Sequence, residues 1–251
     1  MLILLPPSEG KTRPDSGPPL DLASLSFPEL TKTRELLLRT LIRVSGGNPR
    51  TAARTLGLGP TQADALEVNT ALMEEPTARA DEVFTGVLFE AADLSSLDPA
   101  ARRRADTSIA IASGLFGLVR PDDLIPAYRL AGNVTLPRLG TVQSRWKPVV
   151  PKAIEVAAAG GLVIDLRSGT YTAFGAAPAD RTATIRVLQE RDGTRSVVSH
   201  FNKATKGRIV RDLLQSGDEP ATIEELAEAL TGLGWTIERH AHRLDVIVSD
   251  V

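Results

Sequence analysis

The sequence contains no cysteine, and this absence excludes several kinds of chemistry. Disulfides, iron–sulfur clusters and a thiol peroxidase mechanism all need cysteine, so peroxide cannot be consumed by a thiol of this chain. Histidine and methionine are also scarce, at three and two residues. His240 and His242 have no neighbouring ligand set that is typical of a metal site. We therefore expect no resident metal, no cofactor and no redox sensing through sulfur.

Two further features are missing, namely a strong charge of one sign and a long apolar run. The 29 basic and 31 acidic residues give a net charge of −2, so any site for a nucleic acid must be a local patch. The apolar run at Leu2–Leu5 is too short for a membrane span or a signal peptide. We therefore expect a cytoplasmic protein with no membrane partner.

What the sequence does contain is typical of a globular α+β protein, with 251 residues of which 42% are hydrophobic. Apolar runs and alternating patterns predict strands at residues 2–5, 109–112, 162–166, 182–189 and 195–200, and a terminal hairpin at 235–239 and 244–248. Helical patterns separate the first strands from each other. We predict a single domain, residues 1–251, with a mixed β-sheet core, flanking helices and a helical insertion at about 29–106.

Sequence signals also predict the bounds of three helices. One begins near Glu29 and ends near Val44, before a glycine-rich stop. Another opens at Thr222, where Glu225 three residues later completes a capping box. A third is predicted over residues 143–159, although its prolines must lie in the first turn or break the helix.

Residues 51–66 predict two short helices joined by a glycine turn. The turn carries Gly57 and Gly59, and Ala63 and Leu66 follow them at the spacing of a helix-hairpin-helix. Glycines let backbone amides approach a phosphate closely, and the second helix would offer its positive N-terminus. Such contacts bind DNA without reading its sequence. The alternative is a packed pair of helices with a purely structural turn.

The segment Ser113–Leu130 follows the second buried strand and combines glycines, two X-Pro steps and charged side chains. Because proline restricts the residue before it, the segment predicts a stiff loop that fixes its side chains in place. These side chains include Arg120, Asp122, Asp123, Tyr128 and Arg129. The alternative is a structural crossover whose charges are merely solvated.

Several other polar residues come just after predicted strands, where ligands of α/β sheets commonly bind. Ser8 and Lys11 follow the first strand, and Asp165 and Ser168 lie at the end of the strand at 162–166.

A basic stretch follows the predicted strand at 195–200. Lys203, Lys206, Arg208 and Arg211 lie within nine residues that include no acidic residue. On a helix, residues three or four apart share a side, so this is the strongest local basic patch in the chain. A solvated helix face is the alternative reading of the same pattern.

Short motifs in a fixed order also make the chain recognisable. The central one reads Ser113-Gly-Leu-Phe-Gly-Leu-Val-Arg-Pro-Asp-Asp-Leu-Ile-Pro-Ala-Tyr-Arg-Leu130. The others are Pro7-Ser8, Lys11-Thr12, Phe84-Thr-Gly86, Trp146, Asp165-Leu-Arg-Ser-Gly-Thr-Tyr171 and Ser199-His-Phe-Asn-Lys-Ala-Thr-Lys-Gly-Arg208. Together they resemble the YaaA-like peroxide stress proteins over nearly the whole chain. The resemblance implies a cytosolic protein of mixed α and β structure that binds DNA and limits oxidative damage when peroxide rises. It implies no particular reaction.

We therefore expect folding to gather cationic and hydroxylic residues into one cleft beside the glycine turn. The expected DNA- or anion-contacting residues are Ser8, Lys11, Gly57, Gly59, Arg120, Tyr128, Arg129, Ser168, Lys203, Lys206 and Arg208. The first hypothesis is a DNA-binding protein of the peroxide stress response that contacts phosphates of duplex or single-stranded DNA. The alternative is an enzyme that acts on a nucleotide, nucleobase or other phosphorylated small molecule in the same cleft. Its available acids and bases are Tyr128, Lys203, Asp123 and Asp165.

Overall fold

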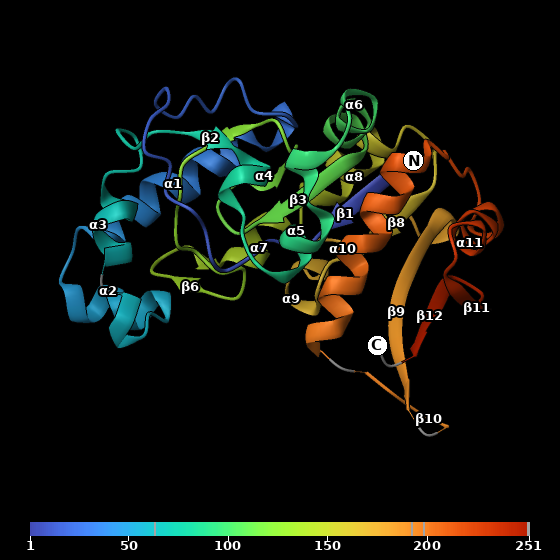
Figure 1. The fold of residues 1–251 in the computed structure, drawn as a ribbon. Helices are drawn as coiled ribbons and strands as arrows, with labels where there is room; N and C mark the ends of the chain where they lie inside the picture. The colour runs from blue at the N-terminus through green and yellow to red at the C-terminus, as the bar shows by residue number, and fades with distance from the viewer. Residues whose placement is uncertain (63, 192, 198, 250–251) are drawn as a thin grey trace.

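An eight-stranded mixed sheet forms the centre of the molecule (Figure 1). The computed structural model describes residues 1–62, 64–191, 193–197 and 199–249. The strands of the sheet are β1 (Leu2–Leu5), β3 (Ile109–Ser113), β4 (Gly117–Val119), β8 (Val163–Asp165), β9 (Thr182–Arg191), β10 (Thr194–Ser196), β11 (Thr236–His240) and β12 (Arg243–Ser249). Their order is β11-β12-β9-β8-β1-β3-β4, with β10 paired to β9. This sheet and its flanking helices confirm the predicted α+β class.

The middle of the sheet is parallel and completely buried. Strand β1 lies between β3 and β8, so that Ile3 pairs with both Ile109 and Ile164. All residues of β1 and β3 are inaccessible to solvent. Continuous apolar runs are typical of such strands, since helices or loops cover both of their faces. Pairs β8–β9 and β9–β12 are also parallel, whereas β4, β10 and β11 pair antiparallel.

Helix α10 (Ser199–Ser216) crosses the front of the sheet in Figure 1 and packs on the short helix α5 (Val87–Ala92). The two backbones meet at Gly207, where an added Cβ would lie 2.3 Å from the carbonyl oxygen of Leu88. Only glycine allows this approach. The contact fixes α10 against α5, so side chains from both helices reach the same cavity.

The remaining elements cover the sheet or extend one end of the molecule. They are η1 (Pro28–Leu30), α1 (Thr31–Ser45), α2 (Pro49–Leu56), η2 (Pro60–Gln62), α3 (Asp64–Thr70), β2 (Ala78–Arg79), α4 (Ala80–Val83), η3 (Leu94–Ser96), α6 (Pro99–Ser108), β5 (Leu124–Ile125), β6 (Thr135–Leu136), β7 (Gly140–Thr141), α7 (Val142–Trp146), α8 (Val150–Ala158), α9 (Gly169–Thr172), η4 (Ala179–Arg181) and α11 (Ile223–Gly232). In Figure 1, α1, α2, α3 and β6 lie together at the end of the molecule opposite β11 and β12. None of the helices in the described residues is long and apolar enough to cross a membrane.

A buried arginine joins α1 to the edge of the sheet. The Arg34 guanidinium is inaccessible to solvent and donates hydrogen bonds to the carbonyl oxygens of Phe116, at 3.0 Å, and of Leu118, at 2.8 Å. Strand β4 is the last strand on this side, so its outward carbonyls have no neighbouring strand. The guanidinium takes the place of that strand and covers the sheet edge.

One predicted strand differs from the structure, and one predicted helix is broken near its prolines, which is one of the two outcomes expected for it. Residues 195–200 are not one strand, because β10 ends at Ser196 and α10 begins at Ser199; residue 198 lies outside the described residues. The predicted helix at 143–159 is two helices, α7 and α8, and Pro151 lies at the start of the second. Proline lacks the amide hydrogen that an uninterrupted helix would need at that point.

Candidate functional site

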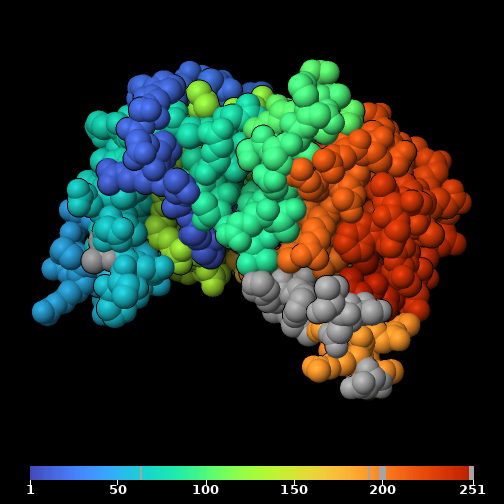
Figure 2. All heavy atoms as spheres, in the orientation of Figure 1, coloured from blue at the N-terminus to red at the C-terminus, as the bar shows by residue number. Residues whose placement is uncertain are grey.

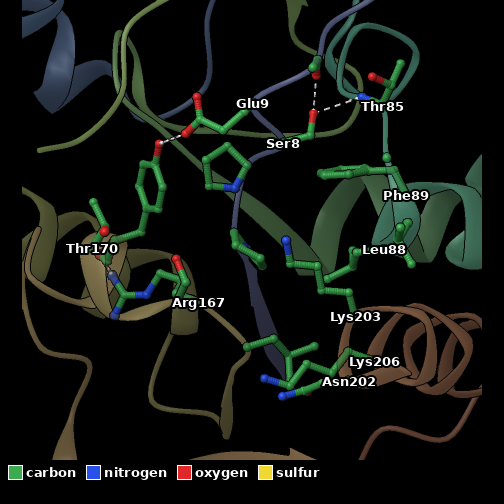
Figure 3. Close-up of a pocket in the computed structure, with 18 of the residues that line it drawn as sticks. Ser8, Glu9, Thr85, Leu88, Phe89, Arg167, Thr170, Asn202, Lys203 and Lys206 are labelled. Carbon is green, nitrogen blue, oxygen red and sulfur yellow. Dashed lines mark hydrogen bonds between the residues drawn. The ribbon is translucent and has the colours of Figure 1, made fainter. Parts of the chain in front are cut away.

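A cavity of about 660 Å³ opens where β1 and β8 end (Figure 3). It is lined by the residues after β1, by the residues after β8, by the start of α5 and by the first turns of α10. Figure 2 shows that the lower edge of the molecule is recessed beside the blue and cyan helical end. The carboxyl ends of neighbouring parallel strands are a usual place for a ligand in such sheets.

Two lysines bring positive charge to this cavity. Lys203 and Lys206 lie three residues apart on α10, and Figure 3 shows Lys203 reaching towards the middle of the cavity. In the part of the chain that the structure describes, neither ammonium has a carboxylate within ion-pair distance. Burial lowers the pKa of Lys206, and the charge of Asp165 opposes this shift. Both lysines are therefore available to bind an anion.

The segment after β8 is held by a buried ion pair. The Arg167 guanidinium donates to both carboxylate oxygens of Asp165, at 2.9 and 2.7 Å, and its side chain is 1% exposed. It also donates to the carbonyls of Tyr171 and Gly175, at 3.3 and 3.1 Å. These bonds shape the turn that presents Ser168 to the cavity. Asp165 therefore positions the turn, and its carboxylate is already neutralised by Arg167.

The segment after β1 contributes a hydroxyl and a carboxylate. The Ser8 hydroxyl accepts a hydrogen bond from the Thr85 amide at 2.9 Å and donates to the Gly10 carbonyl. Glu9 pairs with Arg129 at 3.2 Å, and the Tyr171 hydroxyl lies 3.5 Å from its other oxygen (Figure 3). Burial raises the pKa of Tyr171 above its ordinary range, so the phenol stays protonated at neutral pH.

Lys11 and Tyr128 lie beneath this segment. The Lys11 ammonium lies 4.3 Å from the centre of the Tyr128 ring and donates to the Ser8 carbonyl at 3.1 Å. Burial lowers the pKa of Lys11 to about 8. The Tyr128 hydroxyl is hydrogen-bonded to the Ser113 hydroxyl at 2.7 Å, and burial raises its pKa strongly. Neither side chain lines the cavity, so both support the segment that does.

One wall of the cavity is apolar. It is formed by Pro6, Pro7, Leu88 and Phe89. The Phe89 ring stacks on the buried Phe84 ring with 5.6 Å between centres and 21° between planes. A cavity that combines apolar residues, an aromatic ring and two lysines suits a ligand that has both a flat ring and a negative charge.

A second cavity, of about 520 Å³, adjoins the first. The two share Glu9, Ala131 and Asn133 as lining residues, and the second is also lined by Arg54, Gly57 and Arg129, among others. The structure therefore brings the glycine turn and Arg129 next to the lysine-bearing cavity.

The helices on either side of the glycine turn fit the helix-hairpin-helix prediction only in part. Gly57 has φ +65 and ends α2 in the left-handed conformation that glycine favours. The Gly59 amide donates to the Gln62 side chain at 3.0 Å, so it is already satisfied. Helix α3 has only seven residues, and Asp64 and Glu67 in its first turn would repel a phosphate. Ala63 lies outside the described residues.

Three residues of the predicted site line neither cavity. The Arg120 guanidinium donates to the Ile109 carbonyl at 2.8 Å and stacks on Phe27. The buried Asp123 carboxylate accepts from the Ser26 hydroxyl at 2.9 Å and from the Arg120 amide at 2.7 Å. Both side chains hold the fold together. Arg208 is exposed on α10 and lines neither cavity.

The first part of the predicted stiff loop, Ser113–Val119, is buried in the core. It contains the last residue of β3, the tight connection at 114–116 and strand β4, and all of these residues are buried. A Cβ on Gly114 would lie 2.1 Å from the Leu130 carbonyl oxygen, and one on Gly117, at φ +77, would meet the Trp146 ring. The glycines are therefore required by close packing.

Some lining residues carry no clear sequence signal. Arg54 is an isolated charge between Ala53 and Thr55, and Phe89 lies in a stretch that reads simply as a helix. Glu9 was also missed, although its position shortly after β1 and beside Ser8 could have identified it. Phe89 becomes recognisable only when α5 is placed against α10.

These observations define an α+β protein with a lysine-bearing cavity at the carboxyl ends of a parallel strand core. The family model described as Peroxide stress protein YaaA matches residues 1–241. The chain thus belongs to the YaaA family of peroxide stress proteins. It is similar to a UPF0246 protein of Streptomyces coelicolor, 46% identical over 261 residues that cover 100% of both chains. A UPF0246 protein of Corynebacterium efficiens is 42% identical over 251 residues, which cover 98% of each chain.

Proposed function

We propose that this member of the family binds DNA, and that the two adjoining cavities hold the phosphates. Lys203 and Lys206 would contact phosphates in the first cavity, and Arg54 and Arg129 in the second. The observation that carries the proposal is the pair of lysines in a cavity at the strand ends, with no carboxylate partner in the described part of the chain. Contacts of this kind position a nucleic acid without reading its sequence.

The glycine turn has a narrower role in this proposal than its sequence motif implies. Gly57 and Arg54 line the second cavity, whereas the acidic first turn of α3 would repel phosphates. We therefore assign phosphate contact to the α2 side of the turn. The family's role in peroxide stress is compatible with a chain that binds DNA, because the chain has no thiol with which to consume peroxide.

The test is the salt dependence of DNA binding. Fluorescence anisotropy with a labelled duplex and the matching single strand, over a range of salt concentrations, gives the number of phosphates contacted. K203Q/K206Q should reduce the magnitude of the slope of log K against log salt by about 1.8 for duplex DNA, at about 0.9 per contact. The matched control is R103Q/K152Q, which removes two exposed charges from α6 and α8, away from both cavities.

The control variant should bind like the unmodified protein. If the unmodified protein binds neither DNA form at low salt, DNA binding is not its function. If K203Q/K206Q binds with an unchanged slope, the first cavity is not the phosphate site.

The apolar wall favours a second candidate function, binding or conversion of a nucleotide-like molecule. Phe89 lines the same cavity as the two lysines, and an aromatic ring near positive charge suits one base with its phosphate. A thermal-shift screen of nucleotides separates the two functions. A ligand at about 100 times its Kd stabilises by about 2.7 kcal/mol, which raises Tm by about 5–10 °C in a chain of this size. A specific nucleotide that produces this shift would favour the second function over the first.

A further inference from the structure

A third hollow, of about 290 Å³, lies between α1 and the turn that joins β6 to β7. Its charged lining residues are all arginines: Arg39 and Arg43 from α1, and Arg138 from the turn. All three are exposed. This hollow is separate from the two cavities described above, with which it shares no lining residue.

The three positive charges have been brought together without a compensating acid. Arg39 and Arg43 are four residues apart on α1, so their side chains are neighbours on one helix face, where like charges repel. Arg138 adds a third guanidinium from another segment. Within the residues that the structure describes, no carboxylate lies within 4.0 Å of any of the three, and Glu35, one turn before Arg39, forms no ion pair with it. Arginines elsewhere in the chain, such as Arg13 and Arg195, do pair with carboxylates.

The turn itself is built so that it presents Arg138. This residue has φ +62, in the left-handed region that side chains other than glycine seldom adopt. The adjoining hydrogen bond, from the Leu139 amide to the Leu136 carbonyl at 3.1 Å, closes the turn, and Leu136 is buried. The apolar anchor fixes the turn against the helical end of the molecule and leaves the guanidinium at its tip.

The same hairpin connects this hollow to the second cavity. Val134 and Thr135 line the second cavity, and Arg138 lines the third hollow only three residues further on. Strand β6 contacts both α1 and α2. A chain of phosphates that leaves the second cavity and passes over the hairpin therefore meets the three arginines next.

We propose that Arg39, Arg43 and Arg138 form a separate binding site for the phosphodiester backbone of DNA, which lengthens its footprint beyond the two cavities. This inference depends on the proposed function, the binding of DNA. Arginine suits it because its planar fork can donate two hydrogen bonds to one phosphate.

The test compares R39Q/R138Q with the unmodified protein on short and long oligonucleotides. Arg43 stays in place because it lies in the last turn of α1, where a positive charge stabilises the helix. A single strand of about 8 nucleotides fills roughly one site, whereas one of about 24 can extend further. On the short strand the variant should bind like the unmodified protein. On the long strand the magnitude of its salt slope should fall by about 1.4, at about 0.7 per contact of a single strand.

R103Q/K152Q again serves as the charge-matched control and should retain the full slope on both strands. If the unmodified protein binds no DNA, the proposed function and this site fail together. If it binds DNA and R39Q/R138Q keeps the full slope on the long strand, the arginine site is wrong while DNA binding in the cavities stands. Loss of affinity on the short strand as well would also overturn the proposal, since the arginines would then act within the cavities.

Discussion

Lys11 is a buried ammonium whose partners are all neutral or distant. Its pKa is lowered to about 8, first by burial and then by Arg129, while Glu9 opposes the shift. Between this value and the ordinary value of 10.5, the folded protein binds fewer protons at Lys11 than the unfolded chain does. Stability therefore rises as the pH rises through this window, and the charged ammonium makes folding less favourable below it.

Lys11→Met should remove this pH dependence while keeping an unbranched side chain of similar length. Between about pH 7.5 and 9.5 the free energy of unfolding of the unmodified protein should rise by about 2 kcal/mol relative to that of the variant. Urea titrations of both proteins at several pH values in this window measure the difference. Parallel pH profiles of the two proteins would show that Lys11 is not the titrating group.

Replacement of Gly114 tests how tightly the β3–β4 connection is packed. Its missing side chain lets the Leu130 carbonyl approach to a point 2.1 Å from where a Cβ would lie. Gly114→Ala should therefore lower the free energy of unfolding by at least about 2–3 kcal/mol, because a backbone atom must move. Gly232→Ala is the control, because nothing lies within 4 Å of its Cβ position at the end of α11. Equal stabilities of the two variants would contradict this account.

At the scale of elements, the turn between β8 and α9 depends on one ion pair. Asp165→Asn leaves the Arg167 guanidinium buried without its negative partner, which should cost about 3–5 kcal/mol. The free energy of unfolding from urea titration measures this loss. The control is Asp180→Asn, whose carboxylate pairs with Arg181 but is 75% exposed; it should change stability by less than about 1 kcal/mol. If the two variants lose similar stability, the buried pair does not hold the turn.

Elements with one strong local signal could be predicted from the sequence. The apolar runs that became β1, β3 and β8 were confirmed, as was α11, where the Thr222 hydroxyl accepts from the Glu225 amide at 3.1 Å. The start of α10 could not be predicted. The alternation of polar and apolar residues before it is typical of a strand, and the packing of α10 on α5 lies outside what a local pattern can show.

The residues of the candidate site could likewise be predicted from the sequence only in part. Position after a strand end located Ser8 and Ser168, and the run of basic residues located Lys203 and Lys206. Arg120 was predicted to contact an anion from a stiff loop, whereas in the folded chain its guanidinium donates to the Ile109 carbonyl and lines neither cavity. No local pattern reveals which carbonyl an arginine will meet.

At the scale of the whole molecule, the positive groups are local and the net charge is −2. We therefore expect that, under the proposed function, DNA is contacted at the two cavities and the arginine site, and the variants proposed above test these parts separately. A protein with a broad basic surface would lose affinity for DNA gradually, whichever of its lysines or arginines was replaced. Here only the charges in these three hollows should change the salt slope.

The position of β1 in the middle of the sheet bears on how the chain folds during synthesis. Its residue Ile3 needs Ile109 on one side and Ile164 on the other, so the strand is made long before either neighbour exists. Parallel pairing across such separations slows folding, and an unpaired apolar strand invites aggregation while it waits. Strand β1 can therefore pair on both sides only after about two thirds of the chain has been synthesised, and until then its four apolar residues lack the neighbours that bury them in the folded protein.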